Sequence, residues 1–160
     1  MAPSPSFGHQ QRNGALYRFF EPLLRPRGLG VVFELNLMRP DVELEDFRIP
    51  DQTFYRLDRP DLVREQGLVG AEAVVEIRSP DDETYEKLDF YAELGVREVI
   101  VLDRDSSRVE IFRLAGARYV AVSPDDRGRL YSEVLDARFA ASSVNRRLLR
   151  VECGGAAIEV

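Results

Sequence analysis

Three residues of this sequence, Asp51, Glu76 and Lys87, have the side chains that metal-assisted hydrolysis of a phosphodiester needs. Two carboxylates and a backbone carbonyl suit a hard divalent cation, which gathers phosphate oxygens and makes hydroxide from water. A compact ammonium group suits the attacking water or the negative charge that develops on the phosphate. Lys87 is the only lysine among 22 basic side chains, so the sequence places its one such group in this region.

Each of these residues also has an ordinary structural explanation. An aspartate after a proline, as in Pro50-Asp51, often marks a turn or the start of a strand. Glu76 could be a surface side chain, although in a buried position its carboxylate would need a partner or a metal. Lys87 follows Glu83 by four residues, the favourable order for a helix ion pair worth about 0.2–0.5 kcal/mol. The residues alone leave both explanations open.

The elements around Glu76 and Lys87 are predicted as a βαβ unit. Residues 71–78 should form a strand with Glu76 and Val74 on one face and Val75 and Ile77 on the other. A helix should follow from Ser79-Pro80, because serine caps a helix and proline fits its first position, and it should run to Leu94, where Gly95 ends it. The apolar run of residues 96–102 is typical of a strand buried on both faces. Strand, helix and strand then form a right-handed crossover.

The other elements are predicted from hydrophobic periodicity. A helix is expected over residues 10–24, and strands over residues 31–37, 44–49 and 52–57 before the βαβ unit. Further strands are expected after it, over residues 108–114, 118–122, 130–134, 145–152 and 156–160. The fold class is therefore α/β, with a mixed sheet of roughly seven or eight strands and few helices. The length suits a disordered lead over residues 1–9 and a single domain over residues 10–160.

Two more charged residues are candidates for auxiliary roles. Arg78 shares a strand face with Glu76 and would either contact a phosphate or neutralise that carboxylate. Glu34 lies on an early strand and would be either an auxiliary acid or a surface residue.

Two repeated patterns allow a structural and a functional interpretation. The stripe Tyr85, Leu88, Tyr91 and Ala92 has helical spacing, which favours a core face over a platform for stacking bases. The arginines at positions 146, 147 and 150 alternate with apolar residues, and they suit a phosphate backbone or a charged strand edge equally well.

The composition excludes several kinds of site. Cys153 is the only cysteine, and His9, in the expected lead, is the only histidine. A disulfide within the chain, a thiolate zinc cluster, a histidine-based triad and a multi-histidine metal site are therefore excluded. The single lysine does not follow a glycine, which excludes a GxxxxGK phosphate loop.

The sequence predicts neither a membrane span nor a secretory signal. No apolar run approaches the ~20 residues of a membrane span, and the first residues do not read as a secretory signal. We therefore expect a cytoplasmic protein with no membrane partner. The net charge is −6, but residues 41–100 alone hold 17 acidic and 7 basic side chains. Such an acidic segment is either a solvated face or the location of carboxylates that a metal neutralises.

Three stretches together carry a resemblance to a known family. They read IPDQTFY from residue 49, AVVEIRSPDDETYEKLDFYAELGVREVIVLD from residue 73 and RVEIFRL from residue 108. Over residues 9–114 the chain resembles the Uma-type restriction endonuclease domain family of the PD-(D/E)xK nuclease superfamily. This resemblance implies a restriction-endonuclease-like core with an N-terminal helix and additional C-terminal strands.

The resemblance also implies a set of site residues. Asp51 and Glu76 would ligate Mg²⁺ or Mn²⁺, with the backbone carbonyl of Ile77 as a third candidate ligand. The lysine of the usual ExK pattern would fall at position 78, which is Arg78 here, so its role would pass to Lys87 on the helix. Gln52 stands where the family more often has an apolar residue.

Three hypotheses about function follow. The first is a Mg²⁺- or Mn²⁺-dependent endonuclease that cleaves DNA, for which a homodimer would supply one site for each strand. The second is a catalytically inactive binding or regulatory module that keeps the nuclease fold, which the arginine at position 78 would favour. The third is an interaction domain whose acidic segment is only solvated surface. A site that unites Asp51, Glu76 and Lys87 distinguishes the first two from the third.

Overall fold

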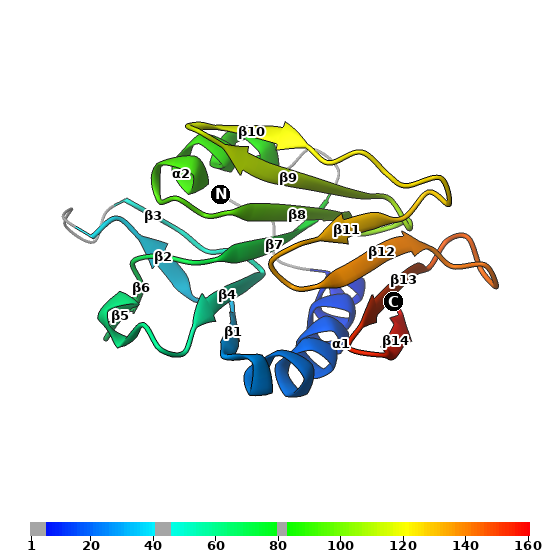
Figure 1. Cartoon of the computed structure of the whole chain (residues 1–160), viewed down its shortest axis with the longest axis horizontal. Helices are drawn as coiled ribbons and strands as arrows, with labels where there is room; N and C mark the ends of the chain where they lie inside the picture. The colour runs from blue at the N-terminus through cyan, green and yellow to red at the C-terminus, as the bar shows by residue number, and fades with distance from the viewer. Residues whose placement is uncertain (1–5, 41–45, 80–82) are drawn as a thin grey trace.

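The computed structural model describes residues 6–40, 46–79 and 83–160. Within them the fold is mixed α/β, with a central six-stranded sheet in the order β1-β4-β7-β8-β9-β10 (Figure 1). Its strands are β1 (Leu29–Phe33), β4 (Gln52–Arg56), β7 (Ala73–Arg78), β8 (Glu98–Asp103), β9 (Val109–Ala115) and β10 (Arg118–Ala121). The β7–β8 pair is parallel and the other neighbouring pairs are antiparallel. The predicted fold class is confirmed.

The predicted βαβ unit is present, with a shorter helix. β7 leads into the 3-10 turn η3 (Thr84–Lys87) and helix α2 (Leu88–Glu93), after which β8 pairs with β7 from Ala73↔Glu98 onward. The helical segment ends as expected, because Leu94 is its cap and Gly95 has a φ of 71°. Among the described residues after β7, the helical segment begins at Thr84, because Glu83 is a non-helical cap; the predicted start at Pro80 lies outside the described residues.

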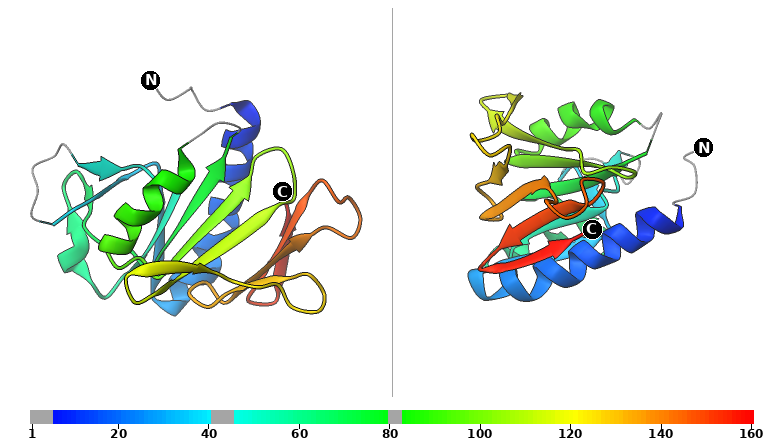
Figure 2. Two further views of the ribbon diagram at one scale, coloured as in Figure 1. Left: turned by 90° about the horizontal axis from the view of Figure 1, so that it is seen from above. Right: turned by 90° about the vertical axis from the view of Figure 1, so that its right-hand side faces the viewer.

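Alternate side chains of β7 enter two different cores, as the strand pattern predicts. Val75 and Ile77 pack with α1 (Phe7–Leu24) and with the C-terminal strands, whereas Val74 packs with Phe90 and Tyr91 of α2. Figure 2 shows α1 and α2 on opposite sides of the central sheet. The sheet is therefore held between two helices, and each helix can present side chains to the end of β7.

Helix α1 begins at Phe7, three residues before the predicted start. The Ser6 hydroxyl accepts a hydrogen bond from the backbone N–H of His9 at 3.3 Å, which is an N-cap. The expected disordered lead is therefore wrong for residues 7–9, and His9 lies in a helix; residues 1–5 are outside the described part. No described helix is long and apolar enough to cross a membrane.

The strand predicted over residues 31–37 is interrupted. Glu34 has a φ of 51°, which ends β1 and sends β2 (Asn36–Met38) into a second sheet. That sheet has the order β3-β2-β6-β5 and contains β3 (Phe47–Arg48), β5 (Val63–Arg64) and β6 (Gly67–Leu68), with a 3-10 turn, η2 (Pro60–Leu62), before β5. Only Phe47–Arg48 remains of the strand predicted over residues 44–49, whose first two residues are outside the described part.

A third sheet is formed by the C-terminal strands β11 (Leu130–Ser132), β12 (Ala137–Ala141), β13 (Leu149–Cys153) and β14 (Ala156–Glu159). β12 was not predicted, and the described residues hold fourteen strands in three sheets rather than seven or eight in one. A 3-10 turn, η1 (Arg25–Arg27), connects α1 to β1. Phe20 of α1 packs against Phe139 of β12, with ring centroids 6.4 Å apart. The third sheet thus shares the core of α1.

Buried Glu98 ties this third sheet to the central one. Its Oε1 accepts hydrogen bonds from the guanidinium of Arg113 at 2.9 Å and from the backbone N–H of Glu133 at 3.0 Å. Its Oε2 accepts a hydrogen bond from the Ser132 hydroxyl at 2.5 Å. Because these partners satisfy the buried carboxylate, its role is structural.

Candidate active site

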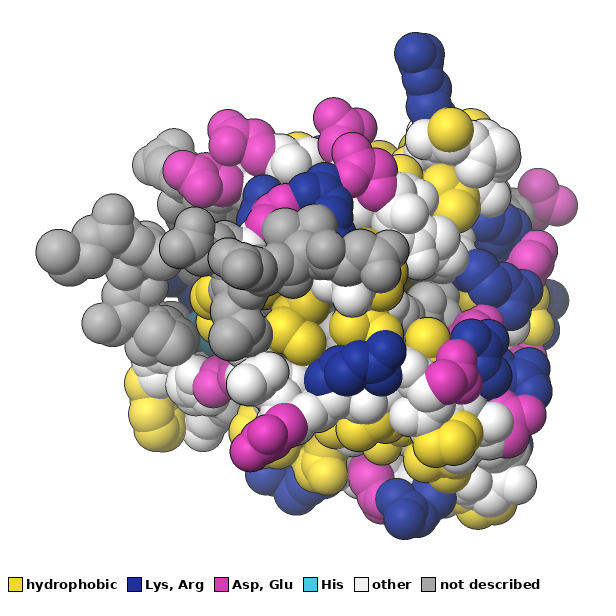
Figure 3. Space-filling view, turned by 90° about the vertical axis from the view of Figure 1, so that its left-hand side faces the viewer, with side chains coloured by type: hydrophobic (Ala, Val, Ile, Leu, Met, Phe, Trp, Pro, Cys, Tyr) yellow, Lys and Arg dark blue, Asp and Glu magenta, His cyan; other side chains and the backbone are white. Residues whose placement is uncertain are grey.

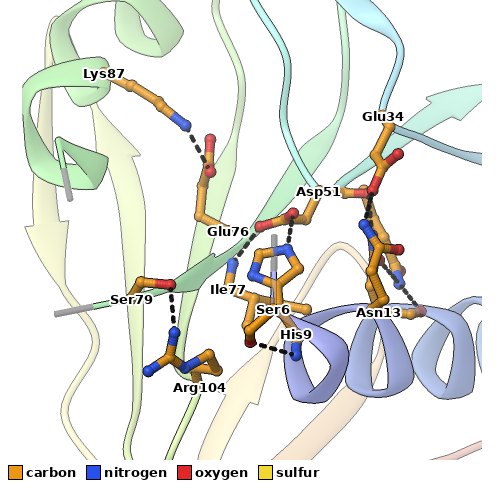
Figure 4. A network of polar contacts seen from close by, with 12 residues as sticks. Ser6, His9, Asn13, Glu34, Asp51, Glu76, Ile77, Ser79, Lys87 and Arg104 are labelled. Atoms are coloured by element: carbon orange, nitrogen blue, oxygen red, sulfur yellow. Dashed lines mark hydrogen bonds and ion pairs between the residues drawn. The ribbon is translucent and has the colours of Figure 1, made fainter. Parts of the chain in front are cut away.

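Strand pairing brings Glu34, Asp51 and Glu76 into one row across the central sheet. β1 pairs with β4 at Phe33↔Gln52, and β4 pairs with β7 at Gln52↔Val75. Asp51 therefore lies between the other two acids, and its backbone carbonyl accepts a 3.3 Å hydrogen bond from the N–H of Glu34. Figure 4 shows the Asp51 side chain reaching toward His9 and Ile77, and the Glu76 side chain reaching from the neighbouring strand toward Lys87.

Glu76 is the most buried of these acids, with a relative exposure of 3%. Lys87 Nζ donates to Glu76 Oε2 at 2.8 Å, and the Tyr91 hydroxyl donates to Glu76 Oε1. Lys87 and Tyr91 are four residues apart, so they lie on the same side of the helical segment. The sequence-predicted catalytic residues Glu76 and Lys87 are therefore in direct contact.

The charge of Glu76 is only partly compensated. The pKa of Glu76 is raised from 4.5 to about 7. Burial has the largest effect and raises the pKa, as does the negative charge of Asp51, whereas the charge of Lys87 and the hydrogen bonds from Lys87 and Tyr91 lower it. Burial and the adjacent Glu76 carboxylate also raise the pKa of the Tyr91 hydroxyl, which therefore stays protonated as the donor. An additional positive charge nearby would stabilise the ionised form of this carboxylate.

Asp51 is held by two donors from opposite directions. Its Oδ2 accepts the backbone N–H of Ile77 at 2.5 Å, and its Oδ1 lies 2.6 Å from His9 Nε2. The hydrogen bond to Asp51, together with the charges of Asp51 and Glu34, raises the pKa of His9, against the effects of burial and of Arg104. The Ile77 N–H is thus used to orient Asp51, while metal ligation by the Ile77 carbonyl stays a prediction.

The two auxiliary candidates lie at the edge of this cluster. The Arg78 guanidinium stacks over the Tyr85 ring at 5.1 Å, and among the described residues the ion-pair partner of Glu76 is Lys87 rather than Arg78. Glu34 accepts a hydrogen bond from Gln10 Nε2 at 2.7 Å, which ties it to α1. Lys87 pairs with Glu76 and not with Glu83, the structural alternative for Lys87, because Glu83 precedes the helical segment.

Gln52, the residue after the PD motif, is fully buried. Its Nε2 donates to the backbone carbonyl and to the side-chain oxygen of Asn13, both at 2.9 Å. Asn13 in turn donates to the backbone carbonyl of Asp51 at 3.3 Å. Helix α1 therefore contacts Asp51 and Gln52 through two residues about one turn apart, His9 and Asn13.

Sequence reasoning missed two residues of this cluster, His9 and Tyr91. His9 was assigned to the disordered lead, although Ser6 was available as a cap that would start the helix early enough to include it. Tyr91 was assigned to a core stripe, and its ring is indeed buried. Its spacing of four residues from Lys87 was the signal that it would face the same strand.

The donor set suits a hard divalent cation. Across residues 6–40, 46–79 and 83–160, no three or more histidine, cysteine, aspartate or glutamate side chains are grouped to hold a metal ion. Mg²⁺, however, is usually bound by one or two carboxylates, with water and substrate phosphates completing its shell. Asp51 and Glu76 supply two such carboxylates, and the raised pKa of Glu76 is the electrostatic condition that a cation would relieve.

Comparison with known proteins now identifies the family. A family model named Uma2, described as "Putative restriction endonuclease", matches residues 1–142. The chain belongs to this family. This membership confirms the resemblance carried by the three sequence stretches quoted above, and it supports a nuclease function for the chain. A search of curated proteins finds no match.

Solved structures show a similar fold for this Uma2 chain. A crystal structure from Anabaena variabilis, titled as a putative nuclease belonging to DUF820, aligns with a TM-score of 0.60 and 16% sequence identity. The alignment covers 77% of this chain and 72% of that one. A second structure, titled as a cryoEM structure of a DrdV-DNA complex, aligns with a TM-score of 0.40 and 12% identity over 73% of this chain and 10% of that one. The first alignment supports the nuclease-like fold.

Proposed function

We propose that this protein is a divalent-metal-dependent endonuclease that hydrolyses phosphodiester bonds in DNA. The observation that carries the proposal is the contact of Lys87 with Glu76, a buried carboxylate beside Asp51 whose pKa is raised to about 7. Mg²⁺ or Mn²⁺ would be held by Asp51 and Glu76, with the Ile77 carbonyl as a candidate third ligand. When bound, such an ion neutralises phosphate charge and lowers the pKa of water.

The residues of the chain have separate roles in this proposal. Packing of β7 against α2 buries Glu76 away from water, and this burial strengthens the electrostatic interactions of its carboxylate. Lys87 is 26% exposed, so its ammonium faces both Glu76 and the solvent. It can therefore donate a hydrogen bond to the attacking water or to a phosphate oxygen. Hydrolysis then joins the water oxygen to phosphorus while the bond to the leaving oxygen breaks, and that oxygen takes up a proton.

The distribution of charge on the surface bears on how the protein would bind DNA. On the face in Figure 3, acidic, basic and hydrophobic side chains are mixed, without a continuous basic patch. If DNA bound across this face, few phosphate contacts would form and the affinity would depend weakly on salt concentration, because each contact releases about one counterion. The proposal includes a homodimer, which would supply one site for each strand of a duplex and which sedimentation analysis would test.

One observation favours the inactive binding module as a second candidate. Each carboxylate oxygen of the pair already has a protein donor: Lys87 and Tyr91 for Glu76, and His9 and Ile77 for Asp51. If the Lys87 ammonium stayed on Glu76 when DNA was bound, it would not reach the attacking water or a phosphate oxygen, and the chain would bind nucleic acid without cleaving it.

The test is cleavage of supercoiled, linear and single-stranded DNA by the purified chain with Mg²⁺, Mn²⁺ or a chelator. We expect cleavage that the chelator abolishes, and a loss of at least 100-fold in the folded variants Asp51→Asn and Glu76→Gln. Lys87→Arg keeps the charge, yet the fork of a guanidinium does not reproduce a compact ammonium, so it should also lose activity. Arg97→Lys, at the exposed ion pair with Glu72, is the matched control and should retain it.

Three outcomes would contradict the proposal. Cleavage that survives both Asp51→Asn and Glu76→Gln would show that the activity comes from elsewhere. Metal binding without cleavage of any DNA would support the binding module. Full activity in Lys87→Arg would reduce Lys87 to the structural partner of Glu76.

A further inference from the structure

Helix α1 places His9 against the proposed metal-binding aspartate. His9 Nε2 lies 2.6 Å from Asp51 Oδ1, and the two side chains are only 12% and 14% exposed. Figure 4 shows the ring reaching from α1 toward Asp51 at the end of the central sheet, with Glu76 on the neighbouring strand. This contact joins segments 42 residues apart, so it depends on how α1 packs against the sheet.

The position of His9 is fixed independently of Asp51. The guanidinium of Arg12, one turn further along α1, donates to the backbone carbonyls of Ser106 at 3.0 Å and of Val160 at 3.1 Å, and to that of Asp103. The Ser6 cap fixes the first turn of the helix. The imidazole is therefore presented by a helix that is anchored to the loop after β8 and to the C-terminal strand.

The number of hydrogen bonds that the Asp51 carboxylate can accept indicates the role of His9. An ionised carboxylate only accepts hydrogen bonds and has about two lone-pair sites on each oxygen. Ile77 N–H occupies one site on Oδ2 and His9 occupies one site on Oδ1. With one donor on each oxygen the carboxylate has a fixed orientation, and each oxygen keeps a site for a further partner.

We propose that His9 is a positioning residue that holds the Asp51 carboxylate in the orientation in which it binds a divalent cation. The proposal rests on the proposed function, because it assigns the cation to Asp51 and Glu76. Ligating carboxylates are commonly held by such outer hydrogen bonds, and loss of one typically lowers metal affinity by about 10–100-fold. His9 acts through Asp51 and does not need to touch the substrate.

The alternative is that His9 merely fastens α1 to the sheet. The two roles differ in what replaces the imidazole. Glutamine places an amide N–H near the position of Nε2 and so keeps a donor for Asp51, whereas alanine removes it. Arg12→Ala loosens the same helix without touching Asp51, which makes it the matched control for a purely structural effect.

The experiment measures Mn²⁺ binding to the full chain from the electron paramagnetic resonance signal of free Mn²⁺, with circular dichroism as the check on folding. We expect His9→Ala to lower the affinity about 10–100-fold. His9→Gln should recover most of it, and Arg12→Ala should lower the thermal midpoint while the affinity changes less than about threefold. Glu76→Gln, at the other carboxylate, reports whether the bound Mn²⁺ is the one at this site.

Two results would overturn the His9 role alone: wild-type affinity in His9→Ala while Glu76→Gln abolishes binding, or an equal loss in His9→Ala and Arg12→Ala. Absence of Mn²⁺ binding in the wild type would overturn the His9 role together with the metal-dependent function. His9-dependent binding in a chain that cleaves no DNA would support the His9 role and overturn only the endonuclease.

Discussion

Replacing Glu76 by glutamine should stabilise the metal-free protein at alkaline pH. Glu76 is 3% exposed, and its pKa in the folded chain is about 7 instead of 4.5, because burial disfavours the ionised form more than Lys87 favours it. At 1.36 kcal/mol per pH unit, the ionised side chain costs the folded state about 3 kcal/mol. Glutamine has nearly the same shape, can still accept the Tyr91 hydrogen bond and carries no charge.

The direction of the pH dependence follows from the raised pKa. Between pH 4.5 and about 7 the folded chain binds more protons at Glu76 than the unfolded chain does. The contribution of protonated Glu76 to the stability of the wild-type folded chain is therefore complete below pH 4.5 and is lost as the pH rises through 7. The free energy of unfolding of Glu76→Gln relative to wild type should accordingly increase by about 3 kcal/mol from about pH 4 to about pH 8.5.

Urea titrations in a chelator, followed by circular dichroism because the chain has no tryptophan, would measure this difference. Glu152→Gln, which removes a carboxylate paired with Arg150 on β13, controls for the loss of one surface charge. Mn²⁺ should reduce the difference at high pH, because a cation beside Glu76 stabilises its ionised form. A difference that stays flat, or that falls with rising pH, would refute the reasoning, since it would mean that the ion pair with Lys87 outweighs burial.

Two further substitutions test one contact within this site and one between the central and third sheets. Tyr91→Phe removes the hydroxyl donor to Glu76, so we expect the free energy of unfolding to fall by about 1–3 kcal/mol. The pKa of Glu76 should rise further in the same pH titration. An unchanged Glu76 pKa would contradict the contact. Glu98→Gln leaves Arg113 without its buried carboxylate and should cost about 1–3 kcal/mol, measured by urea unfolding, without changing Mn²⁺ affinity; a changed affinity would mean that the third sheet acts on the site.

Hydrophobic periodicity correctly predicted the strands whose sequence pattern reflects their burial in the central sheet. β7 and β8 were correct in type and pairing, because alternation on β7 and a continuous apolar run on β8 reflect burial between two helices. The β9–β10 hairpin is only partly buried, and it was predicted from two short strands that are close together in the sequence. The strand over residues 31–37 failed because alternation continues through Glu34, whereas the left-handed φ of that residue redirects the backbone. The unpredicted β12 is a short strand whose core partner, Phe20, is remote in sequence.

The candidate site was predicted in part by chemistry and in part by resemblance. Residue type indicated Asp51, Glu76 and Lys87, and the structure brings Lys87 onto Glu76 and Asp51 beside it. Their role as metal ligands and catalytic lysine stays a prediction. Partner choice could not be predicted, since Glu83 offered Lys87 an equally good local partner, and only the late start of the helical segment removes it.

The residues that sequence reasoning missed share one physical cause. His9 and Tyr91 lie on helices packed against opposite faces of the sheet, and each donates to one carboxylate at the end of adjacent strands. Neither residue is near its partner in sequence, so no spacing rule connects His9 to Asp51. Two carboxylates side by side repel one another and resist burial, and a donor from each helix offsets part of that cost. The same two donors fix the orientation of both carboxylates, so the packing of α1 and α2 sets the geometry that a cation would meet.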